Sequence, residues 1–439
     1  MKTVTVLGAG LAGSECAWQL AKRGINVKLI EMKPVKMTPA HTSPNFAELV
    51  CSNSLRSDEL TNAVGLLQAE MRAMGSLIME SADANKVAAG GALAVDREGF
   101  SKYITDKLKS LPNVEVVSAE ATEIPEGEVV IATGPLSSDA IAEKIAALCP
   151  DSDLHFYDAV APIVTLESVD MDSAFFASRY DKGTADYVNC PMDKDEYLAF
   201  VEELTHAKEA EVHGFDDGGV FEGCMPVEVM ARRGVDTLRY GPLKPVGLID
   251  PRTGRENYAV VQLRRDNADG PIYNIVGFPT HLKWGEQKRV FSMIPALRNA
   301  EFVRYGVMHR NTYLNSPKLL DRYYRLRTDG RISFAGQMTG VEGYVESAAS
   351  GMLVGIETAA RVLGMEPVDF PQETAIGALS LYVSGGSDFQ PMNVNFGIIS
   401  PLGYRVKGKR NKNAEISKRS LEIIESLKAK EVFHCEDNH

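Results

Sequence analysis

Two cysteines lie in polar surroundings that suit a reactive thiol better than a buried one. Cys51 is followed by Ser, Asn, Ser, Leu and Arg56, and Cys224 lies two residues before a proline, between Glu222 and Glu228. The thiolate is the nucleophilic form of cysteine, so a cation such as Arg56 favours reactivity at Cys51, whereas two carboxylates disfavour it at Cys224. Both are candidate catalytic residues, and a purely structural role for either stays open.

The remaining cysteines indicate no further chemistry. The six cysteines of the chain are widely spaced and include no CxxC pair. This spacing argues against a zinc site and against a disulfide framework, so we expect no bound metal and only single thiols. Cys16, Cys149, Cys190 and Cys435 carry no recognisable catalytic constellation, and Cys16 falls on the packing side of a predicted helix.

A glycine-rich turn near the N-terminus predicts a dinucleotide site. An apolar strand at residues 3–7 runs into Gly8, Gly10 and Gly13, and Glu31 closes the next apolar strand. In such a unit the glycines allow a tight turn, close approach of a pyrophosphate and close packing of the following helix. The acidic residue accepts hydrogen bonds from a ribose 2′-hydroxyl and repels a 2′-phosphate, which favours FAD or NAD over NADP. The alternative is a glycine turn in an ordinary α/β fold.

Two later segments favour FAD. Residues 128–134 form a short apolar strand that ends at Gly134, and residues 331–334 form another that leads into Gly336, Gly340 and Gly343. A helical pattern follows at residues 345–363, so a second helix N-terminus is available for the flavin part of the ligand. Taken alone, this segment could be one more βα unit. No second complete glycine motif with its own acid is present, so we identify no Rossmann site for a nicotinamide.

A change of sequence pattern along the chain predicts two domains. We expect an α/β fold with a discontinuous Rossmann-like FAD-binding domain of the glutathione-reductase type at residues 1–170 and 321–439. Between them, acidic helical stretches such as residues 193–211 and alternating segments at 258–263 and 273–277 predict an inserted α+β domain at residues 171–320. We expect this domain to contribute to substrate binding.

Composition suggests a cytoplasmic enzyme. The 439 residues have 44% hydrophobic content, no apolar run of membrane-spanning length and no secretory signal pattern at the N-terminus. We therefore expect no membrane association, and no motif predicts an obligate protein partner.

The distribution of charge along the chain is compatible with an RNA ligand. The net charge of −12 by itself disfavours a polyanionic partner. Two basic blocks nevertheless occur, one at residues 298–331 with interleaved tyrosines and one at residues 405–419. Such blocks can hold phosphates while aromatic rings stack on unpaired bases. The alternative is an ordinary solvated face with ion pairs.

Six motifs, in order along the whole chain, carry a family resemblance. They occupy residues 49–55, 221–228, 239–247, 278–289, 335–346 and 389–396. In these segments the chain resembles the TrmFO family of folate- and FAD-dependent tRNA uracil-5-methyltransferases. The resemblance implies transfer of a one-carbon unit from 5,10-methylenetetrahydrofolate to C5 of uridine 54 in the T-loop of tRNA. It also implies FAD as cofactor and NADPH or NADH as reductant.

The same resemblance implies roles for individual residues. Cys51 lies beside the flavin and Cys224 is a candidate nucleophile, although the order in which the thiols act stays open. His281 resembles an imidazole that stacks on the pterin ring, with an ordinary polar loop residue as the alternative. Tyr344 follows the flavin glycine loop and is expected near the reaction centre, unless it only packs at the helix start.

Two other functions stay open on the residues alone. The same chemistry could act on a ribosomal RNA uridine. A flavin oxidoreductase acting on a small molecule would use the same FAD segments but leave the cysteines structural.

Overall fold

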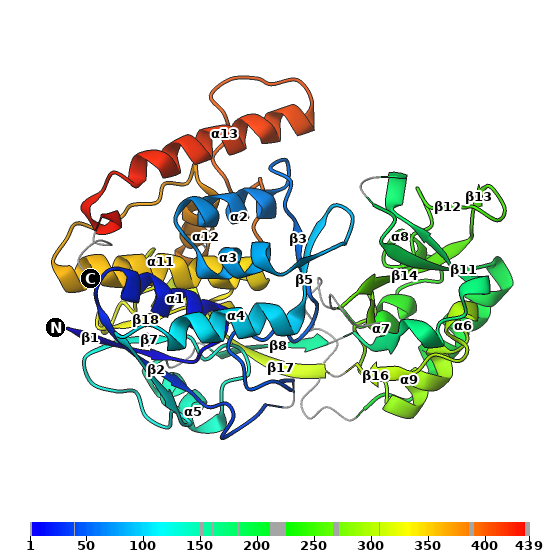
Figure 1. The fold of residues 1–439 in the computed structure, drawn as a ribbon, viewed down its shortest axis with the longest axis horizontal. Helices are drawn as coiled ribbons and strands as arrows, with labels where there is room; N and C mark the ends of the chain where they lie inside the picture. Colours follow the sequence, from blue (N-terminus) through cyan, green and yellow to red (C-terminus); the bar gives the residue numbers. More distant parts are fainter. Residues whose placement is uncertain are drawn as a thin grey trace.

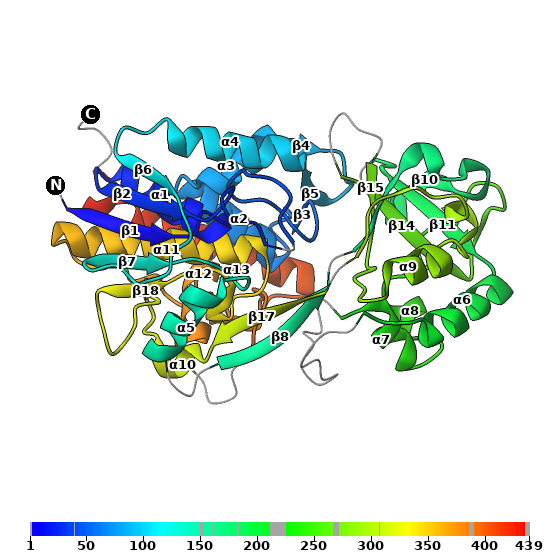
Figure 2. The same cartoon turned by 90° about the horizontal axis from the view of Figure 1, so that it is seen from below.

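The chain folds into two lobes joined by a narrow connection (Figures 1 and 2). The structure is a computed structural model, and it describes residues 2–38, 40–149, 153–159, 161–181, 184–210, 225–266, 272–306, 308–385 and 390–434. Of the site residues predicted above, Cys224 lies outside the described residues, as does Cys435.

The first lobe is built on a parallel five-stranded sheet, as the α/β fold prediction requires. Its order is β18-β7-β1-β2-β6, and every neighbouring pair is parallel. The strands are β1 (Thr3–Leu7), β2 (Asn26–Glu31), β6 (Val114–Ser118), β7 (Glu128–Ile131) and β18 (Ile332–Phe334). Because β1 lies at the centre, the loop after it opens at the carboxyl edge of the sheet, where ligands bind in such folds.

Helices cover both faces of this sheet. Figure 1 shows α1 (Leu11–Lys22) and α11 (Tyr344–Leu363) above the sheet and α5 (Asp139–Leu148) below it. The two upper helices approach at backbone contact, since a Cβ added to Gly351 would lie 2.1 Å from the Ala12 carbonyl oxygen. A Cβ on Gly355 would likewise lie 2.9 Å from the Cys16 carbonyl oxygen. Glycine therefore allows the helices after the two glycine-rich loops to lie side by side.

The rest of the first lobe is a helical layer with a small antiparallel sheet. Glu70 ties this layer together, because its buried carboxylate accepts the backbone N–H groups of Ala375 and Ile376 at 2.7 and 2.9 Å. The helices are α2 (Ala63–Ala73), α3 (Leu77–Ala84), α4 (Arg97–Lys109), α12 (Ala375–Ser384) and α13 (Lys409–Leu427), and the strands are β3 (Ser54–Ser57), β4 (Lys86–Val87) and β5 (Ala92–Val95).

The second lobe has its own sheet and its own hydrophobic core. The sheet is antiparallel, in the order β10-β11-β14-β15-β9-β16. Its strands are β9 (Ile163–Thr165), β10 (Phe175–Ala177), β11 (Tyr187–Met192), β14 (Ala259–Arg265), β15 (Ile272–Ile275) and β16 (Phe302–Arg304). The helices packed with it are α6 (Lys194–His206), α7 (Val227–Arg232), α8 (Thr237–Tyr240) and α9 (Trp284–Phe291). A separate hairpin, β12 (Ile249–Asp250) with β13 (Arg255–Glu256), lies at the outer edge of this lobe (Figure 1).

An antiparallel pair of strands connects the lobes. β8 (Asp153–Ala159) pairs with β17 (Met308–Leu314) and extends toward the second lobe (Figure 2). The strands of the second sheet lie between Ile163 and Arg304. The domain boundaries at 170/171 and 320/321 stay a prediction. Among the described residues, no helix combines the length and the apolar character needed to cross a membrane.

Candidate functional site

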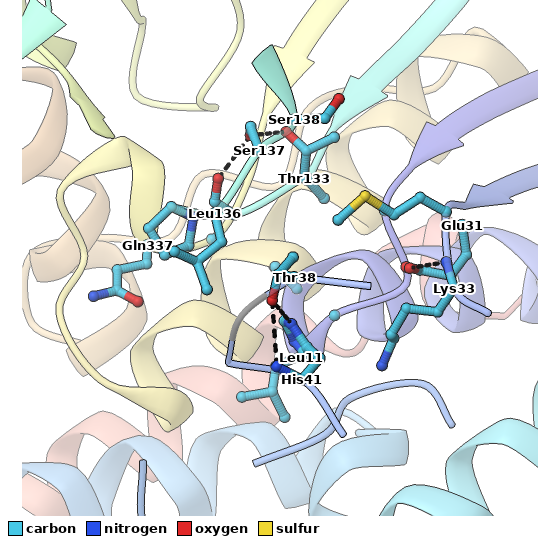
Figure 3. A pocket seen from close by; sticks show the side chains of 18 of the residues that line it. Leu11, Glu31, Lys33, Thr38, His41, Thr133, Leu136, Ser137, Ser138 and Gln337 are labelled. Atoms are coloured by element: carbon cyan, nitrogen blue, oxygen red, sulfur yellow. Dashed lines mark hydrogen bonds between the residues drawn. The ribbon is translucent and has the colours of Figure 1, made fainter. Parts of the chain in front are cut away.

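A cavity opens at the carboxyl edge of the parallel sheet, in front of α1 and α11. It brings together segments from residue 8 to residue 347 (Figure 3). Figure 3 shows Glu31 and Lys33 on one side of the cavity and Gln337 on the other. Of the residues predicted from sequence to bind a cofactor, those that line it are Gly8, Gly10, Glu31, Gly134 and Gly336.

The first glycine loop has the geometry that a dinucleotide needs. Gly8 has φ +92°, and a Cβ there would lie 2.6 Å from the Ala132 carbonyl oxygen. Gly13 does not line the cavity, but a Cβ on it would lie 1.8 Å from the Gly8 carbonyl oxygen, so it sets how closely α1 approaches the loop. Gly10 has open space in front of it and precedes α1, whose N-terminus has no side-chain cap. The first N–H groups of α1 are therefore available to a phosphate.

Glu31 lies at the end of β2, as the ribose-binding role requires. Its carboxylate is buried and accepts the backbone N–H of Ala9 at 2.6 Å and that of Lys33 at 2.9 Å. A carboxylate has about four acceptor positions, so two remain for hydroxyl groups of a ligand. The bonds to the backbone hold the side chain in place next to the glycine loop.

The second glycine loop presents another helix N-terminus to the cavity. Gly336, Gly340 and Gly343 have φ angles of +87°, +88° and +110°, which favour glycine over other residues. Gly340 and Gly343 shape the loop from outside the cavity, and Gly343 leads into α11, which also lacks a side-chain cap. The site offers the uncapped N-termini of α1 and α11, the Glu31 carboxylate and open space before Gly10. Together these features fit FAD.

Tyr344 connects the cavity to the Cys51 loop, which we define as residues 49–53. The Tyr344 hydroxyl oxygen accepts the backbone N–H of Cys51 at 2.6 Å and that of Ser52 at 3.2 Å. Burial raises the pKa of this hydroxyl, so it stays protonated. Tyr344 also lines the cavity, and no hydrogen bond donated by its hydroxyl is found among the described residues. The structure thus brings two of the predicted catalytic residues, 293 positions apart, into contact.

Two arginines hold the same loop, and the sequence analysis predicted this contact for neither of them. Arg304, from the end of β16, donates to the Val50 carbonyl oxygen at 2.6 Å, and Arg97 donates to the Leu49 carbonyl oxygen. Arg97 is also paired with Asp266 at 2.9 Å. No carboxylate of the described chain lies within ion-pair distance of Arg304, whose pKa is lowered by burial and by the neighbouring Arg97. Arg304 is thus a cation beside Cys51 that forms no direct ion pair in the described structure, although the Glu48 carboxylate acts on it from a longer distance.

Arg56, the cation predicted to act on Cys51, has a different partner. It forms an ion pair with Glu346, which is fully buried in the first turn of α11. Glu346 also accepts the Val394 backbone N–H at 2.9 Å. Arg56 therefore neutralises a buried carboxylate, and the cations that contact the Cys51 loop come from elsewhere in the chain.

Residues of β14 bind the far end of the Cys51 loop. Arg264 donates to the Asn53 side-chain oxygen at 3.2 Å and to the Ser52 hydroxyl, while the Asn53 amide donates to the Arg265 carbonyl oxygen at 2.9 Å. The Cys51 loop thus lies where the two lobes meet. Neither Arg264 nor Arg304 lies in a motif with Cys51, so no local signal could have identified them.

His281 lies within the second lobe and away from the cavity. Only 2% of the residue is exposed, and its imidazole contacts Glu209 and Glu228, each at 2.6 Å. Burial alone would lower the pKa of His281, but the two carboxylates outweigh burial and raise it to about 9. Glu228 also accepts the Thr280 hydroxyl at 2.8 Å. Binding of a pterin by His281 stays a prediction.

The two basic blocks differ in structure. In the first, Tyr313 and Tyr324 are buried, so the expectation that these interleaved rings stack on bases is wrong for both. Tyr324 belongs to the hydrophobic core of the first lobe, and the buried Tyr313 hydroxyl donates to Glu342 at 2.6 Å. The second block surrounds the exposed start of α13. Among its described basic residues, Arg410 forms an ion pair, with Glu59 at 3.9 Å.

The chain is similar in sequence to a described family and to individual known proteins. A family model described as "Glucose inhibited division protein A" matches residues 3–366. The methylenetetrahydrofolate–tRNA-(uracil-5-)-methyltransferase TrmFO of Acetivibrio thermocellus is 60% identical over 430 residues, which is 97% of this chain and 99% of that protein. The protein with the same description from Listeria innocua is 57% identical over 428 residues, 97% of this chain and 99% of its own length.

A solved structure supports the fold. The Aquifex aeolicus GidA structure in the form II crystal has a TM-score of 0.71 and 14% sequence identity. The match covers 99% of this chain and 75% of that chain. At this identity the likeness concerns the fold alone, and it agrees with the parallel sheet and the second lobe described above.

Proposed function

The chain belongs to the TrmFO family of methylenetetrahydrofolate–tRNA-(uracil-5-)-methyltransferases, and from this membership we propose that it forms 5-methyluridine at uridine 54 in the T-loop of tRNA. The enzyme uses FAD and 5,10-methylenetetrahydrofolate, with NADPH or NADH as the external reductant. The observation that carries the proposal is the full-length similarity to this family, and the structure supports it by the contact between Tyr344, which lines the cavity, and the backbone of Cys51.

Thiol chemistry explains why a cysteine is needed beside this cavity. Uracil C5 is a poor nucleophile, so a thiolate that adds to C6 makes C5 enolate-like and able to form a bond to carbon. After the C5 proton leaves, the bond between sulfur and C6 breaks and the thiol is released. We propose that Cys51 and Cys224 both take part in the reaction, one as this nucleophile.

The overall reaction balances with reduced FAD as the electron source. Uridine gains one CH₂ unit, methylenetetrahydrofolate becomes tetrahydrofolate, and reduced FAD supplies the two hydrogen equivalents that this change requires. NADPH or NADH then restores the reduced cofactor. The groups proposed to hold the dinucleotide are the Glu31 carboxylate and the backbone N–H groups of the first glycine loop and of the loop before α11.

Side chains of the protein hold the loop that carries the Cys51 thiol and place a positive charge beside it. Tyr344, Arg97 and Arg304 hold the backbone of the Cys51 loop through four hydrogen bonds. Because Arg304 has no carboxylate partner in the described structure, its charge favours an anion beside Cys51, such as a thiolate. The Tyr344 proton can be donated to a ligand oxygen or nitrogen within the cavity.

We further propose that phosphates of the tRNA T-arm contact the exposed start of α13. Arg405, Lys407, Lys409, Arg410 and Lys412 are all exposed there. Contacts of this kind release counterions, so affinity should fall steeply as salt rises. A flat salt response would contradict this part of the proposal.

Nucleoside mass spectrometry tests the function directly. An unmodified tRNA transcript is incubated with the FAD-loaded enzyme, NADPH and methylenetetrahydrofolate labelled in the methylene carbon. A parallel reaction replaces the folate with S-adenosylmethionine. We expect label in 5-methyluridine at the T-loop with the folate donor only.

Two variants and a second substrate complete the test. Cys51→Ala and Cys224→Ala should both lose methyl transfer while retaining FAD, and full activity in either would remove that cysteine from the mechanism. If the enzyme methylates ribosomal RNA but not tRNA, the substrate is a ribosomal RNA uridine. Flavin reduction with no RNA product from either would indicate a small-molecule oxidoreductase.

A further inference from the structure

Three aromatic rings form a stacked column on the second lobe. The rings of Trp284 and Tyr305 lie 5.6 Å apart with an interplanar angle of 12°, and those of Tyr305 and Phe302 lie 5.2 Å apart at 9°. Phe302 packs against the core of the lobe, whereas Trp284 is the outermost ring and is 62% exposed. One face of the indole is therefore covered by Tyr305, and its opposite face is open to solvent.

The column lies next to the Cys51 loop. Tyr305 directly follows Arg304, whose guanidinium donates to the Val50 carbonyl oxygen at 2.6 Å. Trp284 is the first residue of α9, and β16 lies at the border of the second lobe that faces the first (Figure 1). The exposed indole is thus part of the lobe that clamps the proposed reaction centre, close to where an RNA substrate must approach.

The charge around Trp284 suits a polyanion. Lys283 and Lys208 are both exposed, their backbones are joined by a hydrogen bond of 3.0 Å, and neither has an ion pair among the residues that the structure describes. The neighbouring acid, Glu286, is paired with Arg289 at 2.8 Å. Glu286 also accepts the Lys208 backbone N–H at 3.4 Å and feels the charge of Lys208, so Lys283 is the cation beside the exposed ring with no acidic partner among the described contacts, in a chain of net charge −12.

We propose that the open face of Trp284 is a stacking platform for an unpaired base of the tRNA substrate, next to the uridine that is modified. This inference rests on the proposed function and adds a subsite to it. Every base has a π-face, and stacking on an aromatic ring gives affinity for single-stranded nucleotides, while Lys283 and Lys208 hold the adjoining phosphates. An apolar protein partner fits less well, because charged residues and Gly285 surround the indole instead of a continuous apolar patch.

Tryptophan emission gives a direct test, because the chain contains only two tryptophans, Trp18 and Trp284. In the FAD-loaded Trp18→Phe variant, Trp284 is the sole tryptophan. We expect its emission to be quenched when an unmodified T-arm hairpin RNA is titrated in without folate. Quenching by methylenetetrahydrofolate alone, with none by the hairpin, would overturn the inference and assign the platform to the folate.

Binding of a labelled hairpin, followed by fluorescence anisotropy, tests the energetic role without relying on emission. Trp284→Ala should bind about 5- to 150-fold more weakly, as expected for loss of one stacked base, and Trp284→Phe should recover most of the affinity. The matched control is Tyr240→Ala, since Tyr240 is an 83% exposed aromatic residue of the same lobe outside the column. It should bind like the wild type.

Steady-state kinetics distinguish a role of Trp284 in RNA binding from a role in the chemical steps. Trp284→Ala should raise the KM for tRNA while flavin reduction by NADPH stays unchanged. Equal hairpin affinity in Trp284→Ala and wild type would refute the platform, even where the wild type methylates tRNA. A wild type that binds the hairpin through Trp284 but forms no 5-methyluridine would instead refute the proposed function.

Discussion

Replacing Tyr344 with phenylalanine removes one oxygen atom and should loosen the Cys51 loop. That oxygen is the acceptor for two backbone N–H groups, those of Cys51 at 2.6 Å and Ser52 at 3.2 Å. Phenylalanine keeps the ring and its packing, and it leaves the bonds from Arg97 and Arg304 to the loop in place. The variant therefore isolates the contribution of the hydroxyl.

The expected size of the effect follows from the two lost bonds. A buried N–H without a partner costs about 1–3 kcal/mol, and partial exposure of this loop reduces that cost because water can replace the acceptor. The Cys51 bond is short and the Ser52 bond is long, so we assign about 2 kcal/mol to the pair. This corresponds to an increase of about 30-fold in the population of the open loop.

Hydrogen exchange measured by mass spectrometry reports this opening. In the FAD-loaded protein, the amides of Cys51 and Ser52 should exchange about 30-fold faster in Tyr344→Phe than in the wild type. Methyl transfer to tRNA should fall as well, since the thiol is held less precisely. Flavin absorbance after gel filtration checks that the cofactor is retained.

Tyr404→Phe is the matched control. Tyr404 is exposed, and its hydroxyl makes only a long contact of 3.4 Å to Glu415, so the same chemical change there should leave exchange at residues 51 and 52 unaltered. If those amides exchange at the wild-type rate in FAD-loaded Tyr344→Phe, the hydroxyl does not hold the loop and the reasoning is wrong.

Three further predictions concern the cofactor site and the second lobe. Glu31→Gln should weaken FAD binding roughly 10-fold or more, measured as a dissociation constant, because the amide NH₂ would face a backbone N–H donor. Gly351→Ala should destabilise the protein by about 3 kcal/mol in thermal unfolding, because the new Cβ would lie 2.1 Å from the Ala12 carbonyl oxygen. The control is Gly403→Ala, which should not change stability because a Cβ there meets nothing within 4 Å. The carboxylates around His281 raise its pKa from an ordinary value near 6.5 to about 9, so their stabilisation is complete below about pH 6.5 and is lost as pH rises through 9. We expect the urea midpoint to fall over that interval by an amount equivalent to about 3 kcal/mol, and a midpoint independent of pH there would contradict this assignment.

Local patterns predicted the elements that line the cavity. The glycine loop, the acid at the end of β2 and the strand ending near Gly134 are each set by a few consecutive residues, and the structure places Gly8, Glu31 and Gly134 around one cavity. The predicted helix at 345–363 agrees with α11 to within one residue. Glycine spacing and hydrophobic periodicity act over short distances, so they can be read before the fold is known.

Electrostatic partners were harder to predict. Arg56 was the expected neighbour of the Cys51 thiol because it is close in sequence, yet it pairs with Glu346. Arg97 and Arg304 reach the loop instead, the latter from 254 positions away. Which arginine contacts the Cys51 loop depends on how the two lobes pack against each other. No periodic pattern in the sequence predicts that packing.

The sequence by itself determined the family, through six motifs along the chain, and it predicted an FAD site and candidate thiols, because these depend on residue types at short, regular spacing. Only the tertiary structure decided that Tyr344 accepts the backbone of Cys51, that Tyr313 and Tyr324 are buried, and that Trp284 ends an exposed stacked column. These contacts join segments brought together by the packing of α11 on α1 and of one lobe against the other. Their energies depend on burial and distance, which exist only once the chain has folded.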